Sequence, residues 1–282
     1  MKAETTRYIR ATDVSHAISL LAASKGVARL LAGGQSLVPS MNLRLTGEIS
    51  LIDINGLSEL SGIQDNGGTI RIGALTSHRD LTASELLQRK APALSQAATL
   101  IAHAAIRTRG TIGGSLAYCD PAAELPACML ALDATIVVQG PLGERRVAAE
   151  NFFVDVFTTD LAEDEIITTI EVPVAQLGEK QVILELARRS GDYALVGIVL
   201  TRQKENFRIA YFGVGSTAVL ANAAMAALKE GKDIDEACAT LVEDVNPEND
   251  MHASAAVRRH LAKVLLRRAY FATTTIGDAH NG

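Results

Sequence analysis

Aromatic residues are scarce in this sequence of 282 residues, because it contains no tryptophan and its aromatic content is only 4%. Stacking of nucleic-acid bases on aromatic rings is therefore not an expected mode of recognition. The formal net charge is -5, and lysine and arginine form no cluster along the chain. We therefore expect neither a nucleic acid nor an anionic membrane as a partner.

Cysteine is also rare, and the three cysteines, Cys119, Cys128 and Cys238, form no CxxC pair. This pattern fits a reducing compartment and excludes an iron–sulfur cluster built from this chain alone. The first eight residues lack the apolar segment of a signal peptide, and no stretch is apolar over the length that a bilayer requires. We expect a cytoplasmic protein without membrane insertion.

The sequence has the composition of a folded globular protein, with 48% hydrophobic and 21% charged residues. Its length favours two or three lobes. The segment 176–180 is linker-like and marks an expected domain boundary. Beyond it, strands at 182–187, 195–200 and 207–214 are joined by short turns and followed by three helices, which favours an antiparallel sheet with helices, an α+β arrangement.

Thr12 or Asp13 is expected to cap a helix that ends at Gly26. A first glycine pair follows a predicted strand at 28–31, in the order Ala32-Gly33-Gly34-Gln35-Ser36-Leu37. A helical pattern begins directly after it. Paired glycines allow positive φ and close approach of the backbone, so that consecutive N–H groups can point at an anion. The following helix would add its positive N-terminal end. This order predicts a turn that holds a phosphate.

A second glycine stretch is Thr108-Arg109-Gly110-Thr111-Ile112-Gly113-Gly114-Ser115, which again puts a glycine pair between hydroxyl residues. Paired glycines also mark ordinary tight turns, and that alternative stays open for either pair alone. Two pairs with matching hydroxyl neighbours favour a ligand with two phosphates.

The histidines offer little chemistry. A mostly apolar segment at 92–105 predicts one buried helix that carries His103, and Thr76 or Ser77 is expected to cap a helix near 81–87. We interpret His78 and His103 as hydrogen-bonded core or helix-end residues. The chain shows no nucleophile elbow, no metal-ligand spacing and no GxGxxG after a strand, so the chemistry is assigned to a cofactor.

The two glycine stretches, together with 120–126 (DPAAELP) and 188–197 (RRSGDYALVG), resemble the signatures of the flavoprotein (medium) subunits of the molybdenum hydroxylase and xanthine dehydrogenase family. The resemblance covers nearly the whole chain. It implies a two-lobed FAD-binding domain of the vanillyl-alcohol-oxidase-like type at 1–175, with lobes at about 1–57 and 58–175. A smaller C-terminal α+β domain would follow at 176–282.

The resemblance also implies roles for single residues. FAD would be held noncovalently, because Gln35 stands where some related flavoproteins have a histidine bonded to the flavin. The pyrophosphate would be held within the stretch from Ala32 to Leu37 and by the second pair. The expected hydroxyl donors are Ser36, Thr111 and Ser115, and the expected backbone donors are the amides of Gly33, Gly34, Gln35, Gly113 and Gly114.

Three more residues complete the implied site. Glu124 would accept hydrogen bonds from ribityl or ribose hydroxyls, although a carboxylate that offsets a helix dipole is an alternative. Leu161 and Tyr193 would approach the isoalloxazine, with Tyr193 covering one face, although an ordinary interface tyrosine is an alternative for Tyr193. The family often carries Asn where this chain has Ser115, so one amide donor is lost there.

The implied function is electron transfer. In the family, molybdopterin on a large subunit oxidises substrate, and two [2Fe–2S] clusters on a small subunit pass electrons to FAD and then to an external acceptor. Both subunits would be separate chains, in a dimer of heterotrimers. Two alternatives stay open, namely a stand-alone FAD-dependent oxidase or reductase acting on a small molecule, and a non-catalytic nucleotide-binding module.

Overall fold

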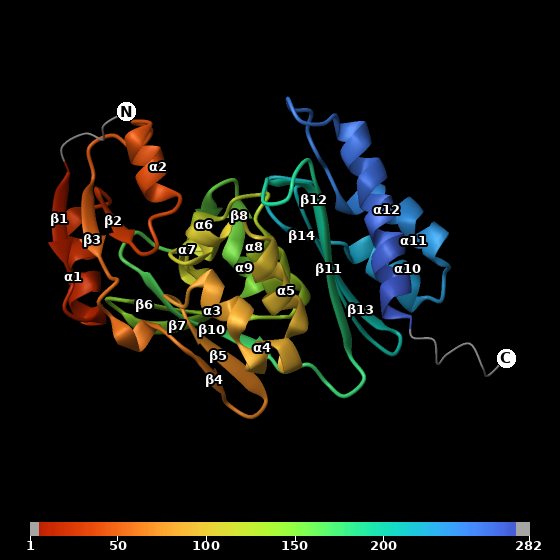
Figure 1. Cartoon of the computed structure of the whole chain (residues 1–282), viewed down its shortest axis with the longest axis horizontal. Coiled ribbons are helices and arrows are strands. Elements are labelled where there is room, and N and C mark those ends of the chain that lie inside the picture. The colour runs from red at the N-terminus through yellow and green to blue at the C-terminus, as the bar shows by residue number, and fades with distance from the viewer. Residues whose placement is uncertain (1–5, 275–282) are drawn as a thin grey trace.

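A computed structural model describes residues 6–274, so the two ends of the expected domains, at 1–5 and 275–282, lie outside the described residues. Figure 1 shows three parts side by side, from an N-terminal lobe through a central lobe to a helix-covered sheet at the C-terminal end. The central and C-terminal sheets are antiparallel, and helices pack against them, as the α+β prediction requires. The prediction of the fold class is confirmed.

The N-terminal lobe is a small parallel sheet in the order β1-β3-β2. The helix expected after residue 12 is confirmed, because the side chain of Asp13 caps it by accepting from the backbone N–H of His16. The strand expected at 28–31 is confirmed and leads into the first glycine stretch. The elements are β1 (Arg7–Arg10), α1 (Val14–Ser24), β2 (Ala28–Leu31), α2 (Leu37–Asn42) and β3 (Ser50–Asp53).

The central lobe is built on a five-stranded antiparallel sheet in the order β4-β5-β10-β6-β7, with helices packed over it. Its strands are β4 (Ile63–Asp65), β5 (Thr69–Gly73), β6 (Thr135–Gly140), β7 (Gly143–Ala148) and β10 (Ile166–Pro173), and β8 (Phe153–Asp155) pairs separately with β9 (Thr158–Thr159). Its helices are η1 (Ser58–Leu60), α3 (His78–Ala83), α4 (Glu85–Lys90), α5 (Pro92–Leu100), α6 (Ala104–Arg107), α7 (Ile112–Tyr118), α8 (Glu124–Ala131) and α9 (Ala149–Phe152).

Two helix predictions in this lobe are wrong in extent. The single helix expected at 92–105 ends at Leu100, because Ala102 takes a left-handed φ of 41° and breaks the helical path. His103 is therefore the residue before α6 and not a residue within a long helix. The helix capped by Ser77 ends at Ala83, and Ser84 caps a separate helix, α4.

The C-terminal part is an antiparallel sheet followed by three helices, as predicted, with one further short strand. Helices α10, α11 and α12 cover one face of the sheet, on the right in Figure 1. The elements are β11 (Lys180–Ala187), β12 (Ala194–Gln203), β13 (Asn206–Phe212), β14 (Val219–Leu220), α10 (Asn222–Lys229), α11 (Ile234–Asp244) and α12 (Ala255–Thr273).

Both faces of this sheet are buried. Along β12, Ile198 and Leu200 pack with the C-terminal helices, whereas the alternate residue Val199 packs into the core of the central lobe. Phe212 of β13 joins that central core as well. The central lobe and the C-terminal sheet therefore share one continuous core.

No helix within residues 6–274 combines the length and the apolar character that crossing a membrane requires.

Candidate functional site

The two glycine stretches, about 75 residues apart in the sequence, lie in direct contact. A Cβ built on Gly33 would fall 2.1 Å from the carbonyl oxygen of Arg109 and 2.8 Å from the Cα of Gly110. A Cβ built on Gly114 would lie 4.0 Å from the Cβ of Ala32. The fold therefore brings together the two segments that the sequence assigned to a single ligand.

The first stretch forms the expected turn. Gly34 has a left-handed φ of 71°, and the side-chain amide of Gln35 donates to the carbonyl of Gly33 (2.9 Å), which fixes the turn from within. In the described part of the chain, no acceptor faces the backbone N–H groups of Gly34, Gln35 and Ser36. These amides are free to donate to an anionic ligand.

The second glycine pair does not form a turn, so this part of the prediction is wrong. Gly113 and Gly114 lie in the first turn of helix α7, with Thr111 as its N-cap. The amide of Gly113 donates to the carbonyl of Ala74 (2.8 Å), and the amide of Gly114 donates to the Thr111 hydroxyl (3.2 Å). Neither amide is a free donor.

Glycine is needed in α7 for close packing. A Cβ on Gly113 would lie 2.6 Å from the Cβ of Ala74, which is closer than side-chain atoms approach. The small residue lets α7 lie against the end of β5. The hydroxyl groups of Thr111 and Ser115 remain as the polar groups at this helix end, and their contact with FAD stays a prediction.

Asn55, which was not predicted from the sequence, stabilises the start of the first turn through its side chain. Its side-chain amide donates to the carbonyls of Leu31 and Ala32, both at 3.0 Å, and to the carboxylate of Asp53 (2.7 Å). These contacts fix the end of β2 where the chain enters the turn. No motif in the sequence marks Asn55, because its partners are 23 and 24 residues away.

Glu124 lies at the N-terminus of α8, where it was expected. Burial raises its pKa to about 8, and the nearby carboxylates of Glu185 and Asp120 add to the effect. Burial likewise raises the pKa of Glu185 to about 7, and its Oε2 atom is buried without a partner in the described structure. Two carboxyl groups thus sit together in a poorly hydrated place, and Glu185 was not foreseen.

Tyr193 lies beside the start of this helix. It is 72% exposed, and its hydroxyl lies near the carboxylate of Asp120. Burial around the hydroxyl and the charge of Asp120 raise its pKa. An exposed aromatic ring is a surface on which a planar ligand can stack. Leu161 is half-buried against the central core, and its approach to a flavin stays a prediction.

His78 lies behind the second stretch. Its backbone N–H donates to the carbonyl of Gly110 (2.9 Å), and a Cβ on Gly110 would lie 2.9 Å from its ring. It is buried, as expected, but among the described residues neither ring nitrogen has a hydrogen-bond partner. Burial lowers its pKa to about 4, which the nearby Thr111 backbone opposes only in part. The expectation of a hydrogen-bonded histidine is wrong.

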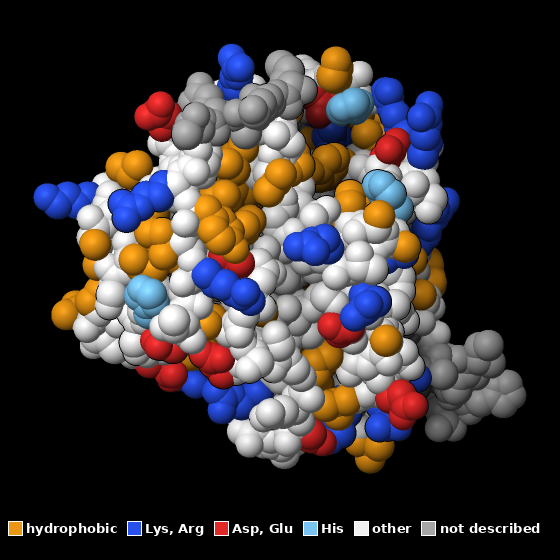
Figure 2. Space-filling model, turned by 60° about the vertical axis from the view of Figure 1, so that its left-hand side comes forward, with side chains coloured by type: hydrophobic (Ala, Val, Ile, Leu, Met, Phe, Trp, Pro, Cys, Tyr) orange, Lys and Arg blue, Asp and Glu red, His pale blue; other side chains and the backbone are white. Residues whose placement is uncertain are grey.

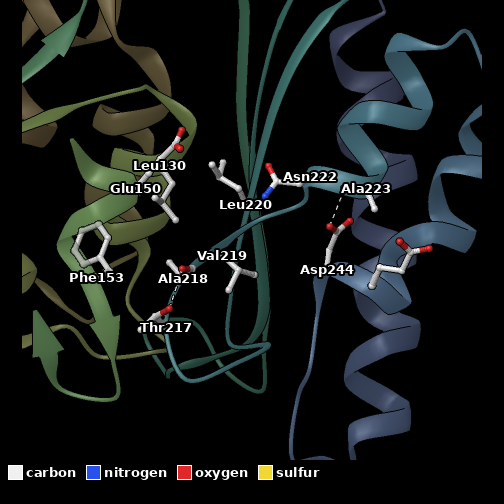
Figure 3. A pocket seen from close by; sticks show the side chains of 11 residues that line it. Leu130, Glu150, Phe153, Thr217, Ala218, Val219, Leu220, Asn222, Ala223 and Asp244 are labelled. Atoms are coloured by element: carbon white, nitrogen blue, oxygen red, sulfur yellow. Dashed lines mark hydrogen bonds between the residues drawn. The ribbon is translucent and has the colours of Figure 1, made fainter.

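A separate pocket of about 670 Å³ opens at the other end of α8 (Figure 3). Leu130 and Phe153 line it from the central lobe, and Asn222 and Asp244 line it from the C-terminal part. The Asp244 carboxylate already accepts from the backbone of Ala223 (2.8 Å) and Ala224 (3.0 Å), so it serves to cap α10. None of the predicted site residues lines this pocket.

Two protein-family models together match nearly the whole chain. Residues 3–175 match the family described as the FAD binding domain in molybdopterin dehydrogenase, and residues 182–273 match the CO dehydrogenase flavoprotein C-terminal domain. The protein is thus a flavoprotein with an FAD-binding domain followed by this C-terminal domain. It belongs to the FAD-binding medium subunits of the molybdenum hydroxylase family, which are oxidoreductases.

Individual relatives agree. The chain is 39% identical to the 6-hydroxypseudooxynicotine dehydrogenase complex subunit alpha of Paenarthrobacter nicotinovorans, over 95% of this chain and 94% of the relative. It is 36% identical to the carbon monoxide dehydrogenase medium chain of Hydrogenophaga pseudoflava, over 91% of this chain and 93% of the relative.

Solved structures show the same fold. Carbon monoxide dehydrogenase from Hydrogenophaga pseudoflava superposes with a TM-score of 0.94 at 36% identity, covering 98% of this chain and 100% of the other. Quinoline 2-oxidoreductase from Pseudomonas putida 86 superposes with a TM-score of 0.90 at 32% identity, covering 97% and 98%.

Proposed function

We propose that this chain is the FAD-carrying electron-transfer subunit of a heteromeric molybdenum hydroxylase. It receives electrons from [2Fe–2S] clusters of a small partner subunit and passes them to an external acceptor. FAD, when bound, supplies the redox chemistry, and the protein supplies position and electrostatics. The observation that carries the proposal is the contact between Gly33 and Arg109–Gly110, which places the free amides of the first turn beside the second stretch.

Different residues contact different parts of FAD. The amides of Gly34, Gln35 and Ser36 hold the pyrophosphate, with the Thr111 and Ser115 hydroxyls opposite them. Glu124 binds a ribityl or ribose hydroxyl, for which either protonation state of its carboxyl offers an acceptor oxygen. Tyr193 and Leu161 contact the isoalloxazine. The binding is noncovalent.

The complex has a large molybdopterin subunit as its third member, and two such heterotrimers pair, in the cytoplasm. The relatives whose names include "complex subunit" and "medium chain" support several partners. Exposed apolar side chains on the N-terminal lobe fit a subunit that is covered by partners, and hydrophobic side chains gather on this side of the molecule in Figure 2. The exposed apolar side chains of the N-terminal lobe are those of Tyr8, Val27, Val38, Leu43 and Leu45.

We propose the domain boundary near 176, with residues 1–175, in lobes at about 1–57 and 58–175, binding FAD. Residues 176–282 then supply Tyr193 to the site. The sheet order supports the boundary, because β11 is the first strand of the C-terminal sheet.

The test is to purify the full chain with excess FAD and record its visible spectrum. We expect about one bound flavin per chain, as judged by flavin absorbance after gel filtration, and no oxidation of aldehydes, purines or N-heteroaromatic compounds by the chain alone. A colourless chain would instead support the non-catalytic module.

One observation favours the stand-alone oxidase or reductase as a second candidate. Such an enzyme needs an acid or base beside the flavin, and Glu124, with its pKa of about 8, could hold or release a proton there at neutral pH. Turnover of a small substrate by the purified chain, abolished in Glu124→Gln, would favour this candidate over the electron-transfer subunit.

A further inference from the structure

Arg258, on the first turn of α12, is the one arginine or lysine that is buried in the described structure, with 8% of it exposed. Its guanidinium donates through Nη1 to the carbonyl oxygens of Leu195 and Gly213, the second at 2.9 Å. Through Nη2 it pairs with the carboxylate of Asp250 at 2.6 Å. A buried charge is retained only when it is paired in this way.

The position of Arg258 is poor for the helix itself. The N-terminal end of a helix is positive, so a cation in its first turn opposes the dipole. The side chain of Ser254 caps this end of α12, and the Asp250 carboxylate offsets the positive charge of Arg258. Helix stability therefore does not explain Arg258, whereas its two carbonyl partners do.

The carbonyl of Leu195 belongs to the segment that carries Tyr193, and the carbonyl of Gly213 belongs to a residue that is bonded to the segment of Asp120. Leu195 lies two residues after Tyr193 in the chain. Gly213, with a left-handed φ of 74°, donates its N–H to the carbonyl of Pro121 (2.8 Å), next to Asp120. The Asp120 carboxylate in turn lies near the Tyr193 hydroxyl. The side chain of Arg258 thus holds the segment of Tyr193 directly and the segment of Asp120 through Gly213.

The turn before α12 holds the other end of the Tyr193 segment. Arg188 donates to the carbonyl of His252 at 2.7 Å, and Asp250 accepts from the backbone of His252 (2.8 Å) and Ala253 (2.9 Å). The segment 188–195 is therefore held at both ends. Its first residue, Arg188, bonds the turn 250–253, and the carbonyl of Leu195 is bonded by Arg258, which pairs with Asp250 of that turn.

We propose that Arg258, with Asp250, is a positioning pair that fixes the Tyr193 ring over the isoalloxazine of FAD. This inference rests on the proposed function. Arg258 does not touch either glycine stretch. It therefore affects the contact between Tyr193 and the flavin ring and leaves the contact with the pyrophosphate unchanged.

The test compares two probes on the full chain, FAD and ADP, because ADP has the pyrophosphate and adenosine but no flavin. For Arg258→Lys, which keeps the charge but cannot reach three oxygens at once, we expect at least about tenfold weaker FAD binding and ADP binding within about twofold of the wild type. Bound-flavin fluorescence should rise, because Tyr193 no longer quenches it.

The matched control is Arg267→Lys, on the same helix. Arg267 pairs with Asp235 at 2.6 Å, on the exposed side of the same helix α12. We expect Arg267→Lys to bind both FAD and ADP with the affinity of the wild type. Arg258→Met and Asp250→Asn serve as further variants, with circular dichroism confirming that each is folded.

A double-mutant cycle separates positioning from a general structural effect. In a Tyr193→Ala background, which alters only an exposed side chain, Arg258→Lys should change FAD affinity by less than about twofold. Equal losses of FAD and ADP affinity, or the full Arg258→Lys effect in the Tyr193→Ala background, would overturn the inference. If the wild-type chain binds ADP but not FAD, the proposed function itself fails.

Discussion

The α-carbon of Gly33 lies directly against the carbonyl of Arg109, so close that even a methyl group in place of its hydrogen would fall 2.1 Å from that oxygen. The contact joins the N-terminal lobe to the segment before α7, and both neighbours are backbone atoms that cannot rotate away. Glycine at position 33 is required by this contact and not by its φ, since Gly34 is the residue of the pair with a left-handed φ.

We therefore predict that Gly33→Ala separates the two stretches, lowers the melting temperature by several degrees and abolishes FAD retention. Gly68→Ala is the control, because nothing lies within 4 Å of the added Cβ. Flavin absorbance after gel filtration and a thermal melt measure both effects. Wild-type occupancy in Gly33→Ala would show that the contact between the stretches is dispensable.

Asn55→Ala should weaken FAD binding by about tenfold, because the carbonyls of Leu31 and Ala32 lose the amide that fixes the start of the turn. Fluorescence titration with FAD checks this expectation. Asn66→Ala, in a different turn of the chain, is the comparison. Equal affinities for the two variants would remove Asn55 from the site.

His78 should make the protein acid-sensitive. Its pKa is about 4 in the folded state and 6.5 in the unfolded state, so between these values the unfolded chain binds the extra proton. Stability is complete above pH 6.5, falls as the pH drops to 4, and the loss amounts to about 3 kcal/mol.

In His78→Leu, the free energy of unfolding should depend less on pH over this window than in the wild type, as measured by urea unfolding at pH 7.5 and pH 4.5. His260→Leu, at an exposed position on α12, should keep the wild-type dependence. Identical pH profiles for His78→Leu and the wild type would contradict a buried neutral imidazole.

Glu124 should make the free energy of unfolding fall with rising pH, which is the opposite of the trend expected from His78. Its pKa is raised from 4.5 to about 8 by folding, so the unfolded chain releases the proton first. Stability contributed by the neutral carboxyl is present below pH 4.5 and is lost as the pH rises to about 8.

Glu124→Gln should gain stability relative to the wild type at pH 8.5, by a margin on the order of a few kcal/mol, and little at pH 5. Glu48→Gln changes an exposed carboxylate and serves as the control. Urea unfolding at both pH values decides, and equal gains at pH 5 and pH 8.5 would argue against a raised pKa.

The sequence predicted the elements whose signals are local. The Asp13 cap, the strand before Gly33 and the antiparallel order of β11, β12 and β13 all follow from neighbouring residues and short turns. The proximity of the glycine stretches was predicted through their matched chemistry, and the fold confirms it.

What could not be predicted depends on partners distant in sequence. The sequence predicts a turn at Gly113 and Gly114, but both lie in a helix, where Ala74, some 40 residues away, requires the small size of Gly113. The break at Ala102 is held by the guanidinium of Arg107, which donates to the carbonyls of Ile101 (2.9 Å) and Ala102 (3.0 Å). Asn55 and Arg258 likewise act on segments that no local pattern connects to them.

The two-sided burial of the β11–β14 sheet limits how this protein can be taken apart. If residues 182–274 were expressed alone, the face that carries Val199, Ala210 and Phe212 would meet water, and the fragment would aggregate or self-associate. A chimaera that exchanges this region between relatives would have to carry matching side chains on α5 and α8. Evolution of the sheet that follows Tyr193 is thereby tied to evolution of the central lobe against which that sheet packs.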